Sequence, residues 1–568
     1  MVEISRYLLQ FSQLVETNNE VAQALKNTGI WNFRQGKQKG DKHRVHITDE
    51  NLCENIISYL KPSLSAYQGC DLLDMFPGAG VWSTALHDLL QPRSHILMEP
   101  EPEIYTPFLQ DLLKRPGVRL APYSGVDWDG IDKVLVPEYL PHQIPVSRTE
   151  PLKRNDTLLL TANLSLFPMK KWHGFKNVAQ MVLYQLIATV RTSFHFHRYG
   201  MIRMLVWTAQ DEKLTILPRN IQDRRRFTIE ADLGTEWIIE VAGNESKNEN
   251  RHVRDRIIDF EGLQEVLANM QRNGMSIPPG RESDLFHELA AAGSDHTFVA
   301  GKDPVNFQHS LAALRREQLR KDVDPDEPDP ALTKRLMLMG NNARLQEKWR
   351  SRFQGWFAEY EELVSLYQAG KHEEAMRGYK DWDDRLRNVP IDRVNEMNLI
   401  QDNLRGFRKK VLHWDRRPYE PLRVLPTDFF PNVESSLLDI QPKSPDPLLL
   451  DAGPGSSRSG DYFETILRAI SHHTQEPLSQ ALRNVWPGAS EAIIPNIPSL
   501  RDPAQGGSPF GGRTEPSLRT LSESQMMELL RAFMEWPFRP NFSSMVGRVM
   551  EEVDVATEED VKLFGDLN

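Results

Sequence analysis

The residues best placed to do chemistry lie in the stretch C-D-L-L-D-M-F-P-G-A-G, residues 70–80. Its apolar first half predicts a buried strand with Asp74 near the end, and residues 81–90 continue with apolar side chains at helical spacing. Between them, Gly78 and Gly80 let the backbone turn tightly and approach a ligand without a Cβ in the way. A glycine turn that opens a helix presents backbone N–H groups to a nucleotide-like ligand. The same letters also occur in plain turns, so both interpretations are open at this point.

A second acidic side chain, Glu99, ends the next predicted strand, residues 95–98. Glu99 follows Asp74 by 25 positions, about the separation at which doubly wound folds place the acid that binds ribose hydroxyls. We therefore expect Asp74, Gly78, Gly80 and Glu99 to line one cofactor site at the carboxyl ends of parallel strands.

The elements that must hold these residues alternate between strands and helices. The predicted strands are 72–75, 95–98, 118–121, 158–161 and 204–207, and the predicted helices include 1–30, 81–90, 177–194 and one from Leu52 that Thr48 or Asp49 caps. Residues 227–230 and 237–241, on either side of Gly234, are predicted to close the sheet as an antiparallel pair. This alternation predicts an α/β, Rossmann-like fold with a mainly parallel sheet between helices. It is typical of methyltransferases that use S-adenosylmethionine, whereas dehydrogenases favour a G-x-G-x-x-G spacing that this chain lacks.

Composition limits the classes of function. The chain has 568 residues, a formal charge of −11 and no run that approaches the roughly 18 apolar residues of a membrane span. Cys53 and Cys70 are its only cysteines, which argues against a disulfide framework or a cysteine metal cage, so we expect no metal. Cleaved transit peptides are poor in acids, whereas residues 1–16 hold two Glu and one Arg, so none is evident. Any contact with nucleic acid must come from local basic patches.

Basic residues gather in one loop, residues 31–44, and in two later clusters, the last with Phe407 and Trp414 interleaved. Basic residues beside aromatic rings suit single-stranded nucleic acid through phosphate contact and base stacking. A solvated face is the alternative for each cluster. The candidate nucleic-acid-binding residues are Lys37, Lys39, Lys42, Arg44, Arg224, Arg225, Arg226, Lys409, Lys410, Arg416 and Arg417.

Four segments occur in a fixed order: D-M-F-P-G-A-G (74–80), I-L-M-E (96–99), T-A-N-L-S-L-F (161–167) and V-L-P-T-D-F-F-P-N-V-E-S-S-L-L-D-I (424–440). This order resembles the ribosomal RNA adenine N6-dimethyltransferase family. Within that family, Y-S-G-V-D-W-D (123–129) and M-I-R-M-L-V-W (201–207) are most similar to the fungal mitochondrial transcription factor B branch. The resemblance covers residues 45–242 and 421–550.

The resemblance implies three parts: a methyltransferase-like core in residues 1–243 completed by 421–445, a charged and mainly helical insertion over 244–420, and a helical C-terminal domain with an acidic tail over 446–568. It also implies a site for S-adenosylmethionine in the core. The cofactor-binding candidates at the matching positions are Asp74, Phe76, Gly78, Gly80, Glu99, Ser124, Asp127 and Asn163.

Departures from the family pattern bear on catalysis. Active members carry Asn-Leu-Pro-aromatic after the fourth strand, where the Asn and the ring hold a flipped adenine. Here residues 163–166 are N-L-S-L, and Phe167 comes one place too late to point the same way. A lost stacking partner removes about 1–3 kcal/mol per base. Phe76 replaces the first glycine of the loop, and Ser124 stands where an acid would contact the cofactor's adenine. We expect Asn163 to be vestigial as a catalytic residue, with a strand-end hydrogen-bonding role as the structural alternative.

Two main functions follow from the resemblance. The first is a noncatalytic initiation factor in the mitochondrial matrix that works with the mitochondrial RNA polymerase in recognising and melting promoter DNA, with a vestigial S-adenosylmethionine site. The second is an active S-adenosylmethionine-dependent adenine N6,N6-dimethyltransferase of the mitochondrial small-subunit rRNA. A third hypothesis is an rRNA-binding assembly factor without catalysis.

The remaining segments are assigned from local patterns. The acidic, proline-rich residues 322–330 are predicted to be extended, and an apolar stripe over 345–367 predicts a helix that packs on neighbouring helices or binds a partner. Residues 448–456 imitate the glycine loop but are predicted to be a turn. The other predictions are a flexible loop over 503–516, a helix over 521–536 and an acidic tail over 551–568 that screens the DNA groove.

Overall fold

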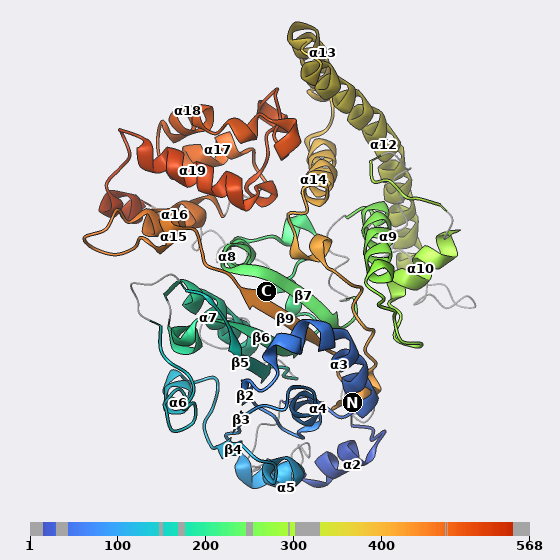
Figure 1. Ribbon diagram of the computed structural model, residues 1–568. Helices are drawn as coiled ribbons and strands as arrows, with labels where there is room; N and C mark the ends of the chain where they lie inside the picture. The colour runs from blue at the N-terminus through green and yellow to red at the C-terminus, as the bar shows by residue number, and fades with distance from the viewer. Residues whose placement is uncertain are drawn as a thin grey trace.

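The computed structural model describes residues 15–29, 44–146, 152–167, 177–192, 194–245, 254–293, 296–301, 330–471, 473 and 475–548. Within this part of the chain, the centre is a seven-stranded sheet in the order β4-β3-β2-β5-β6-β9-β7 (Figure 1). Its strands are β2 (Asp71–Met75), β3 (Ser94–Met98), β4 (Val118–Ala121), β5 (Arg154–Asn163), β6 (Met201–Ala209), β7 (Thr235–Ala242) and β9 (Ser435–Pro442). A second, two-stranded sheet joins β1 (His46–Ile47) to β8 (Phe429–Phe430).

The sheet is mainly parallel, as predicted. The neighbouring pairs from β4 to β6 are all parallel, so the carboxyl ends of these strands meet at one edge. The exception is β9, which lies antiparallel between β6 and β7 and brings residues 435–442, from beyond the insertion, into the sheet. The predicted strands 72–75, 95–98, 118–121, 158–161 and 204–207 all lie within observed strands.

Helices cover both faces of the sheet (Figure 1). One face packs on α3 and α4 through a core that contains Leu72 and Leu159, and the other packs on α6 and α7 through Leu73 and Leu160. Adjacent residues of one strand therefore serve opposite cores, as the alternation of side chains along a strand requires. The helices of this part are α2 (Glu20–Asn27), α3 (Glu50–Leu64), α4 (Val81–Leu90), α5 (Pro102–Leu113), α6 (Trp128–Val134), α7 (Val178–Thr192) and α8 (Arg226–Gly234).

Two N-terminal predictions have different outcomes. Asp49 is the cap of α3, because its Oδ1 accepts a hydrogen bond from Leu52 N at 2.6 Å. The prediction of one helix over 1–30 is too long, because α2 begins only after Asn19, whose Oδ1 accepts from Ala22 N at 2.8 Å. Residues 1–14 and 30 lie outside the described residues.

The predicted antiparallel pair around Gly234 is wrong. Residues 227–230 belong to α8, which buries Ile229 and Leu233 on one helical face. The antiparallel partner of β7 is β9, about two hundred positions further along the chain, with Ile238 opposite Ile440. A prediction from local alternation had no access to that distant partner.

The insertion is helical where it is described, and comprises α9 (Arg256–Arg272), α10 (Asp284–Gly293), α12 (Pro330–Gln368), α13 (His372–Leu386) and α14 (Ile391–Arg408). Helices α12 and α13 form a long arm that projects from the body (Figure 1). The apolar stripe on α12 packs on its neighbours, since Phe353 is buried with Trp382 of α13 and Leu404 of α14. Four further members of the stripe pack against the same cluster: Trp349, Trp356, Tyr360 and Leu363. The predicted packing role is confirmed for these residues, whereas 322–329 of the proline-rich segment lie outside the described residues.

The C-terminal part is a compact group of helices beside the sheet: α15 (Pro447–Leu450), α16 (Ser459–Ile470), α17 (Leu478–Val485), α18 (Ala489–Ile493) and α19 (Glu523–Glu535). Residues 451–456 turn between α15 and α16 as predicted, whereas 448–450, the start of the predicted turn, belong to α15. The segment 503–516 is irregular, but it is anchored and not a free linker, because Ser508 is buried and Phe510 stacks on Tyr379 of α13 at 4.5 Å between ring centroids. The acidic tail, residues 551–568, lies outside the described residues.

Candidate functional site

The glycine turn after β2 has the predicted backbone but is covered by the chain itself. Phe76 adopts a left-handed conformation, with φ of +61°, and its side chain is buried. Gly78 and Gly80 also have positive φ, and Gly80 is the N-cap of α4. A Cβ added at Gly78 would lie 2.5 Å from His46 Nδ1, so the imidazole closes the space above the turn.

The carboxylate of Glu99 is held by groups of its own chain. Arg44 donates two hydrogen bonds to it, from Nη1 to Oε2 at 2.6 Å and from Nη2 to Oε1 at 3.2 Å. The backbone N–H groups of Gly78 and Glu101 donate to the same carboxylate at 3.3 and 3.1 Å. Both partners of the ion pair are buried, with side-chain exposures of 1% for Arg44 and 0% for Glu99.

The Arg44 guanidinium also lies against two aromatic rings. Its central carbon is 5.2 Å from the ring centroid of Phe76 and 4.7 Å from that of Tyr105. A desolvated guanidinium near an aromatic face is stabilised by the ring quadrupole. Arg44 was a candidate nucleic-acid contact, and the structure corrects that prediction because a fully buried side chain cannot reach a phosphate.

Asn163 is engaged by the same segment of chain. Its Nδ2 donates to the carbonyl oxygen of Val45 at 2.9 Å, and its Oδ1 accepts from Ser165 N at 3.2 Å. Val45 N in turn donates to Ser165 O at 3.0 Å, and an isolated bridge joins Arg44 to Leu166. Residues 44–47, which we call the plug, therefore lie across the carboxyl ends of β2, β3 and β5, fixed from outside by the pairing of β1 with β8.

The other predicted cofactor residues are separated from the plug. Asp74 faces β3, where its Oδ2 lies 3.5 Å from His95 Nε2, and His95 Nδ1 is 3.2 Å from His87 Nδ1. Burial, followed by the charge of His95, lowers the pKa of His87 to about 4. Asp74 and Glu99 thus do not share one ligand position. Ser124 and Asp127 line an open cavity of about 620 Å³ after β4.

The predicted basic residues divide into buried and exposed groups. Arg224 and Arg417 are buried, and ion pairs hold them to Asp232 at 2.9 Å and to Glu420 at 3.0 Å, so the structure corrects their assignment as nucleic-acid contacts. Partly buried Arg226 and Lys410 pair with Glu230 at 2.7 Å and Glu265 at 2.5 Å. The exposed members are Arg225, Lys409 and Arg416, while Lys37, Lys39 and Lys42 lie outside the described residues.

The structure brings the two later basic clusters together around Asp232. Arg224 Nε lies 2.9 Å from one oxygen of this carboxylate and His413 Nε2 lies 3.3 Å from the other. Burial raises the pKa of Asp232, and the charges of Arg224 and Arg416 oppose that shift. We call this region, with exposed Arg225 and Arg416 at its surface, the basic junction. It lies where the core meets the C-terminal helices, because Arg224 Nη1 donates to the carbonyls of Arg519 and Leu521 at 2.8 Å each.

Sequence reasoning did not identify two features of this region. The plug has a weak signal, the alternation in R-V-H-I that buries Val45 and Ile47, but nothing local indicates that Arg44 pairs with Glu99. Glu212, beyond the end of β6, was also missed. It is 3% exposed, and burial raises the pKa of its carboxyl to about 7. The signal, a Glu among turn residues, is too common to identify such a site.

Comparison with models of known protein families gives no match to this chain, and comparison with curated proteins gives none either. The described residues contain no cluster of His, Cys, Asp and Glu suited to a metal ion. Among the helices described, none is both long and apolar enough to cross a bilayer.

Proposed function

We propose that this chain is a noncatalytic mitochondrial transcription initiation factor, built on a degenerate rRNA adenine dimethyltransferase fold, that works with the mitochondrial RNA polymerase at promoter DNA. The family and partners come from the sequence resemblance. The single observation that carries the noncatalytic part is the ion pair of Arg44 with Glu99, buried where the spacing of Asp74 and Glu99 predicts the cofactor's ribose.

The arrangement of strands supports the methyltransferase origin. Doubly wound sheets bind ligands at the carboxyl ends of their strands, and here an antiparallel strand is inserted between the last two members of the sheet. That strand comes from one of the four segments on which the resemblance to the rRNA adenine dimethyltransferase family rests. The hallmark segment 424–440 supplies it as β9.

The residues in this arrangement do not fit S-adenosylmethionine. The carboxylate expected to bind the ribose is held by a guanidinium, the turn that would approach the methionine part is covered by His46, and the Asn163 amide is held by the plug backbone. To admit the cofactor, the chain would have to break a buried ion pair and leave Glu99 without its charged partner. Loss of one partner from a buried pair typically costs about 3–5 kcal/mol.

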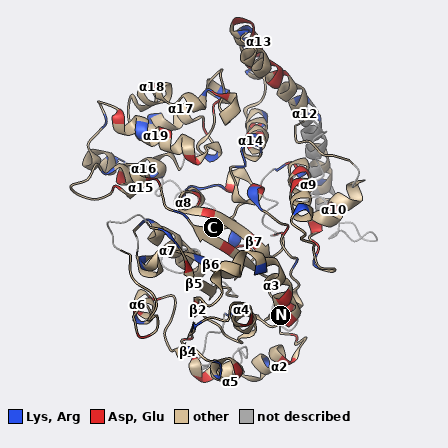
Figure 2. Ribbon diagram, viewed as in Figure 1, with Lys and Arg blue, Asp and Glu red and all other residues tan. Residues whose placement is uncertain are grey.

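The basic junction supports a nucleic-acid partner. Arg225 and Arg416 are exposed there, although they are far apart in sequence, and exposed guanidinium groups can contact phosphates. Figure 2 shows basic and acidic residues interspersed along the ribbon, so affinity for nucleic acid depends on such local placement and not on the net charge.

One preparation should be tested in two assays. Run-off transcription from a mitochondrial promoter with the cognate polymerase, with and without this protein, should give transcripts only when the protein is present. Calorimetry with S-adenosylmethionine should show no saturable binding, and methyl transfer to small-subunit rRNA should match the level of an Asn163→Ala variant. Saturable binding together with methyl transfer that Asn163→Ala abolishes would instead establish the dimethyltransferase. Failure in both assays, with co-sedimentation on the small ribosomal subunit, would favour an assembly factor.

A further inference from the structure

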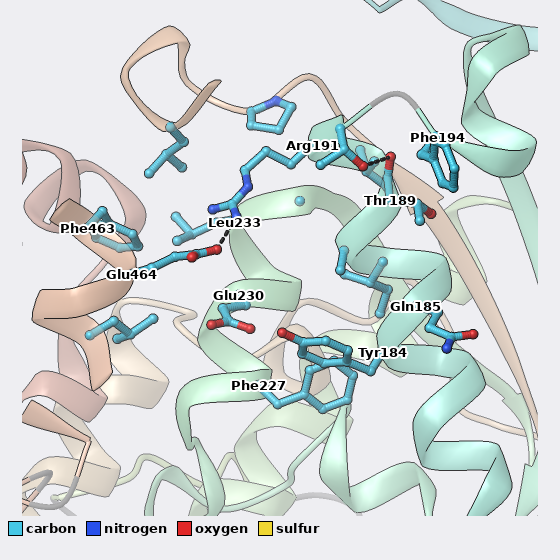
Figure 3. A pocket seen from close by; sticks show the side chains of 18 of the residues that line it. Tyr184, Gln185, Thr189, Arg191, Phe194, Phe227, Glu230, Leu233, Phe463 and Glu464 are labelled. Atoms are coloured by element: carbon cyan, nitrogen blue, oxygen red, sulfur yellow. Dashed lines mark hydrogen bonds and ion pairs between the residues drawn. The ribbon is translucent and has the colours of Figure 1, made fainter. Parts of the chain in front are cut away.

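Two cavities outside the plug and the basic junction meet at Trp128. The first, of about 340 Å³, lies between α7, α8 and α16 (Figure 3). The second is the cavity of about 620 Å³ between the segment after β4, helix α6 and α7. Trp128 and Gln185 line both cavities, so the two adjoin along α7, and we call the pair of cavities the α7 groove.

The first cavity is mostly apolar. Tyr184 and Phe227 lie together on one side, with 5.2 Å between ring centroids, and Phe463 faces them from the C-terminal helices (Figure 3). Glu230 lies between this aromatic pair and the ion pair of Arg191 with Glu464. The volume of this first cavity is near the lower end of the range of ligand pockets, roughly 300–1,000 Å³. The cavity therefore suits one large side chain better than a dinucleotide-sized molecule.

The wall between the cavities carries exposed aromatic rings. Trp128 is 50% exposed and Phe194 is 36% exposed, and their rings meet edge to face at 5.9 Å between centroids. Large apolar side chains gathered at a surface beside a pocket are typical of interaction sites. Tryptophan is also among the residues that contribute most to protein interfaces.

The charge around the α7 groove is acidic. Its lining contains the carboxylates of Asp127, Asp129, Glu230 and Glu464. Glu230 pairs with Arg226 and Glu464 with Arg191, so the acidic charge left for a partner is that of Asp127 and Asp129, with Lys133 beside them. Asp127 and Asp129 are exposed, and neither makes an ion pair with any residue that the structure describes. An acidic groove repels a nucleic-acid backbone and attracts a basic segment, because complementary charge steers association.

We propose that the α7 groove docks a segment of a partner protein that carries one large apolar or aromatic side chain flanked by Lys or Arg. The apolar side chain enters the cavity between α7, α8 and α16, the Trp128 wall contacts the neighbouring residues, and Asp127 and Asp129 pair with the basic ones. This surface is separate from the basic junction, so the inference goes beyond the proposed function and does not depend on it.

To test this, peptides that bind the full-length protein are selected from a displayed library of random heptapeptides. The selected peptides are then fluorescently labelled and their binding to the protein is measured. Ala188→Trp fills the apolar cavity from an exposed position on α7, and Asp129→Lys reverses one charge of the groove. Ala291→Trp places the same side chain at an exposed position of α10 and is the matched control. We expect enrichment of basic sequences with one aromatic or large aliphatic residue. Their binding should weaken at least tenfold in Ala188→Trp and severalfold in Asp129→Lys, with no change in Ala291→Trp.

Three outcomes would overturn the inference: no enriched sequence, enrichment of acidic sequences, or selected peptides that bind Ala188→Trp as tightly as the wild type. A labelled oligo(dT) probe is measured on the same proteins. Loss of its binding in Ala188→Trp, with peptide binding unchanged, would assign the groove to nucleic acid. The peptide result is independent of the transcription assay, so failure of one leaves the other intact.

Discussion

Glu99 accepts hydrogen bonds from the Arg44 guanidinium and from the backbone N–H groups of Gly78 and Glu101. A buried carboxylate needs such partners, because desolvation of an unpaired charge costs several kcal/mol. In a cofactor site, the ribose hydroxyls of a bound ligand would donate some of these hydrogen bonds, and the carboxylate would lose them when the ligand dissociates. Here the partner is covalently part of the chain, which makes the closed arrangement the stable state of the folded protein.

The first prediction concerns this pair. Arg44→Met should lower the free energy of unfolding by about 3–5 kcal/mol, because it leaves the Glu99 carboxylate buried without its cation. Glu99→Gln together with Arg44→Met should cost less than the sum of the two single changes, since no charge then remains unpaired. Urea denaturation followed by circular dichroism gives all four values of this double-mutant cycle.

Lys114→Ala, which breaks an exposed pair with Asp111, is the control and should show no measurable change. An Arg44→Met protein as stable as the wild type would contradict the buried plug.

The second prediction concerns the backbone of Phe76. Its φ of +61° is in the left-handed region, where any side chain with a Cβ is strained by about 1–2 kcal/mol and glycine is not. Phe76→Gly and Phe76→Ala both remove the buried ring, but the glycine variant should be the more stable by about 1 kcal/mol. The control is Ala85 within α4, where replacement by glycine should destabilise the protein by about 1 kcal/mol. The change from alanine to glycine should therefore raise stability at position 76 and lower it at position 85. Thermal or urea unfolding of the variants checks both signs.

The third prediction concerns pH. Burial raises the pKa of the Glu212 carboxyl from 4.5 to about 7, so between these pH values the folded protein holds a proton that the unfolded chain has released. The contribution of Glu212 to stability is therefore complete below pH 4.5 and is lost as pH rises through 7, by on the order of 3 kcal/mol. In Glu212→Gln this loss disappears, so the stability of the variant relative to wild type should increase from pH 5 to pH 8. Exposed Glu138→Gln should keep the wild-type profile, and a Glu212→Gln difference independent of pH would refute the assignment.

At the scale of elements, local patterns predicted most of the sheet and failed where a partner is distant in sequence. The strand, glycine turn and helix from Asp71 to Leu90 follow from apolar periodicity and glycine placement, which act within a few residues. The pairing of β7 with β9 and the plug depend on contacts with residues far away in the chain, so α8 was taken for a strand and Arg44 for a surface cation. Charge alone also could not separate buried Arg224 from exposed Arg225, because burial is decided by the C-terminal helices.

The fourth prediction concerns the anchoring of the insertion. Phe510 stacks on Tyr379 of α13 with ring planes 7° apart and also contacts Tyr360 and Tyr367 of α12. Phe510→Ala should remove this contact, at a cost of up to about 3–5 kcal/mol for a buried ring. Hydrogen exchange should then speed up in α13 and in the second half of α12, while α4 keeps its protection. Phe538, which is 82% exposed, gives the control Phe538→Ala, which should exchange like the wild type. Equal protection of α13 in both variants would show that Phe510 does not hold the arm.

At the scale of the whole molecule, buried ion pairs and hydrogen bonds join the parts. Arg224 ties the end of the core to the backbone of the C-terminal helices, and Arg405 of α14 donates to Thr514 O at 2.8 Å. The basic junction is thus a product of assembly, because Arg224 of the core and His413 of the later segment meet at Asp232, and Arg224 also donates to the backbone of the C-terminal part. Nucleic-acid binding should accordingly depend on the folded whole and not on a basic segment in isolation.

The last prediction tests the basic junction directly. Arg225→Glu with Arg416→Glu should weaken binding of a labelled, partly melted promoter duplex at least tenfold at low salt, since two phosphate contacts are lost. The slope of log affinity against log salt should fall by about 1–2, because fewer counterions are released. Arg377→Glu with Lys380→Glu on α13 makes the same change in net charge at exposed positions of the arm and should leave the slope nearly unchanged. Equal effects of the two double variants would mean that affinity reflects net charge alone, and the basic junction would then have no special role in holding DNA.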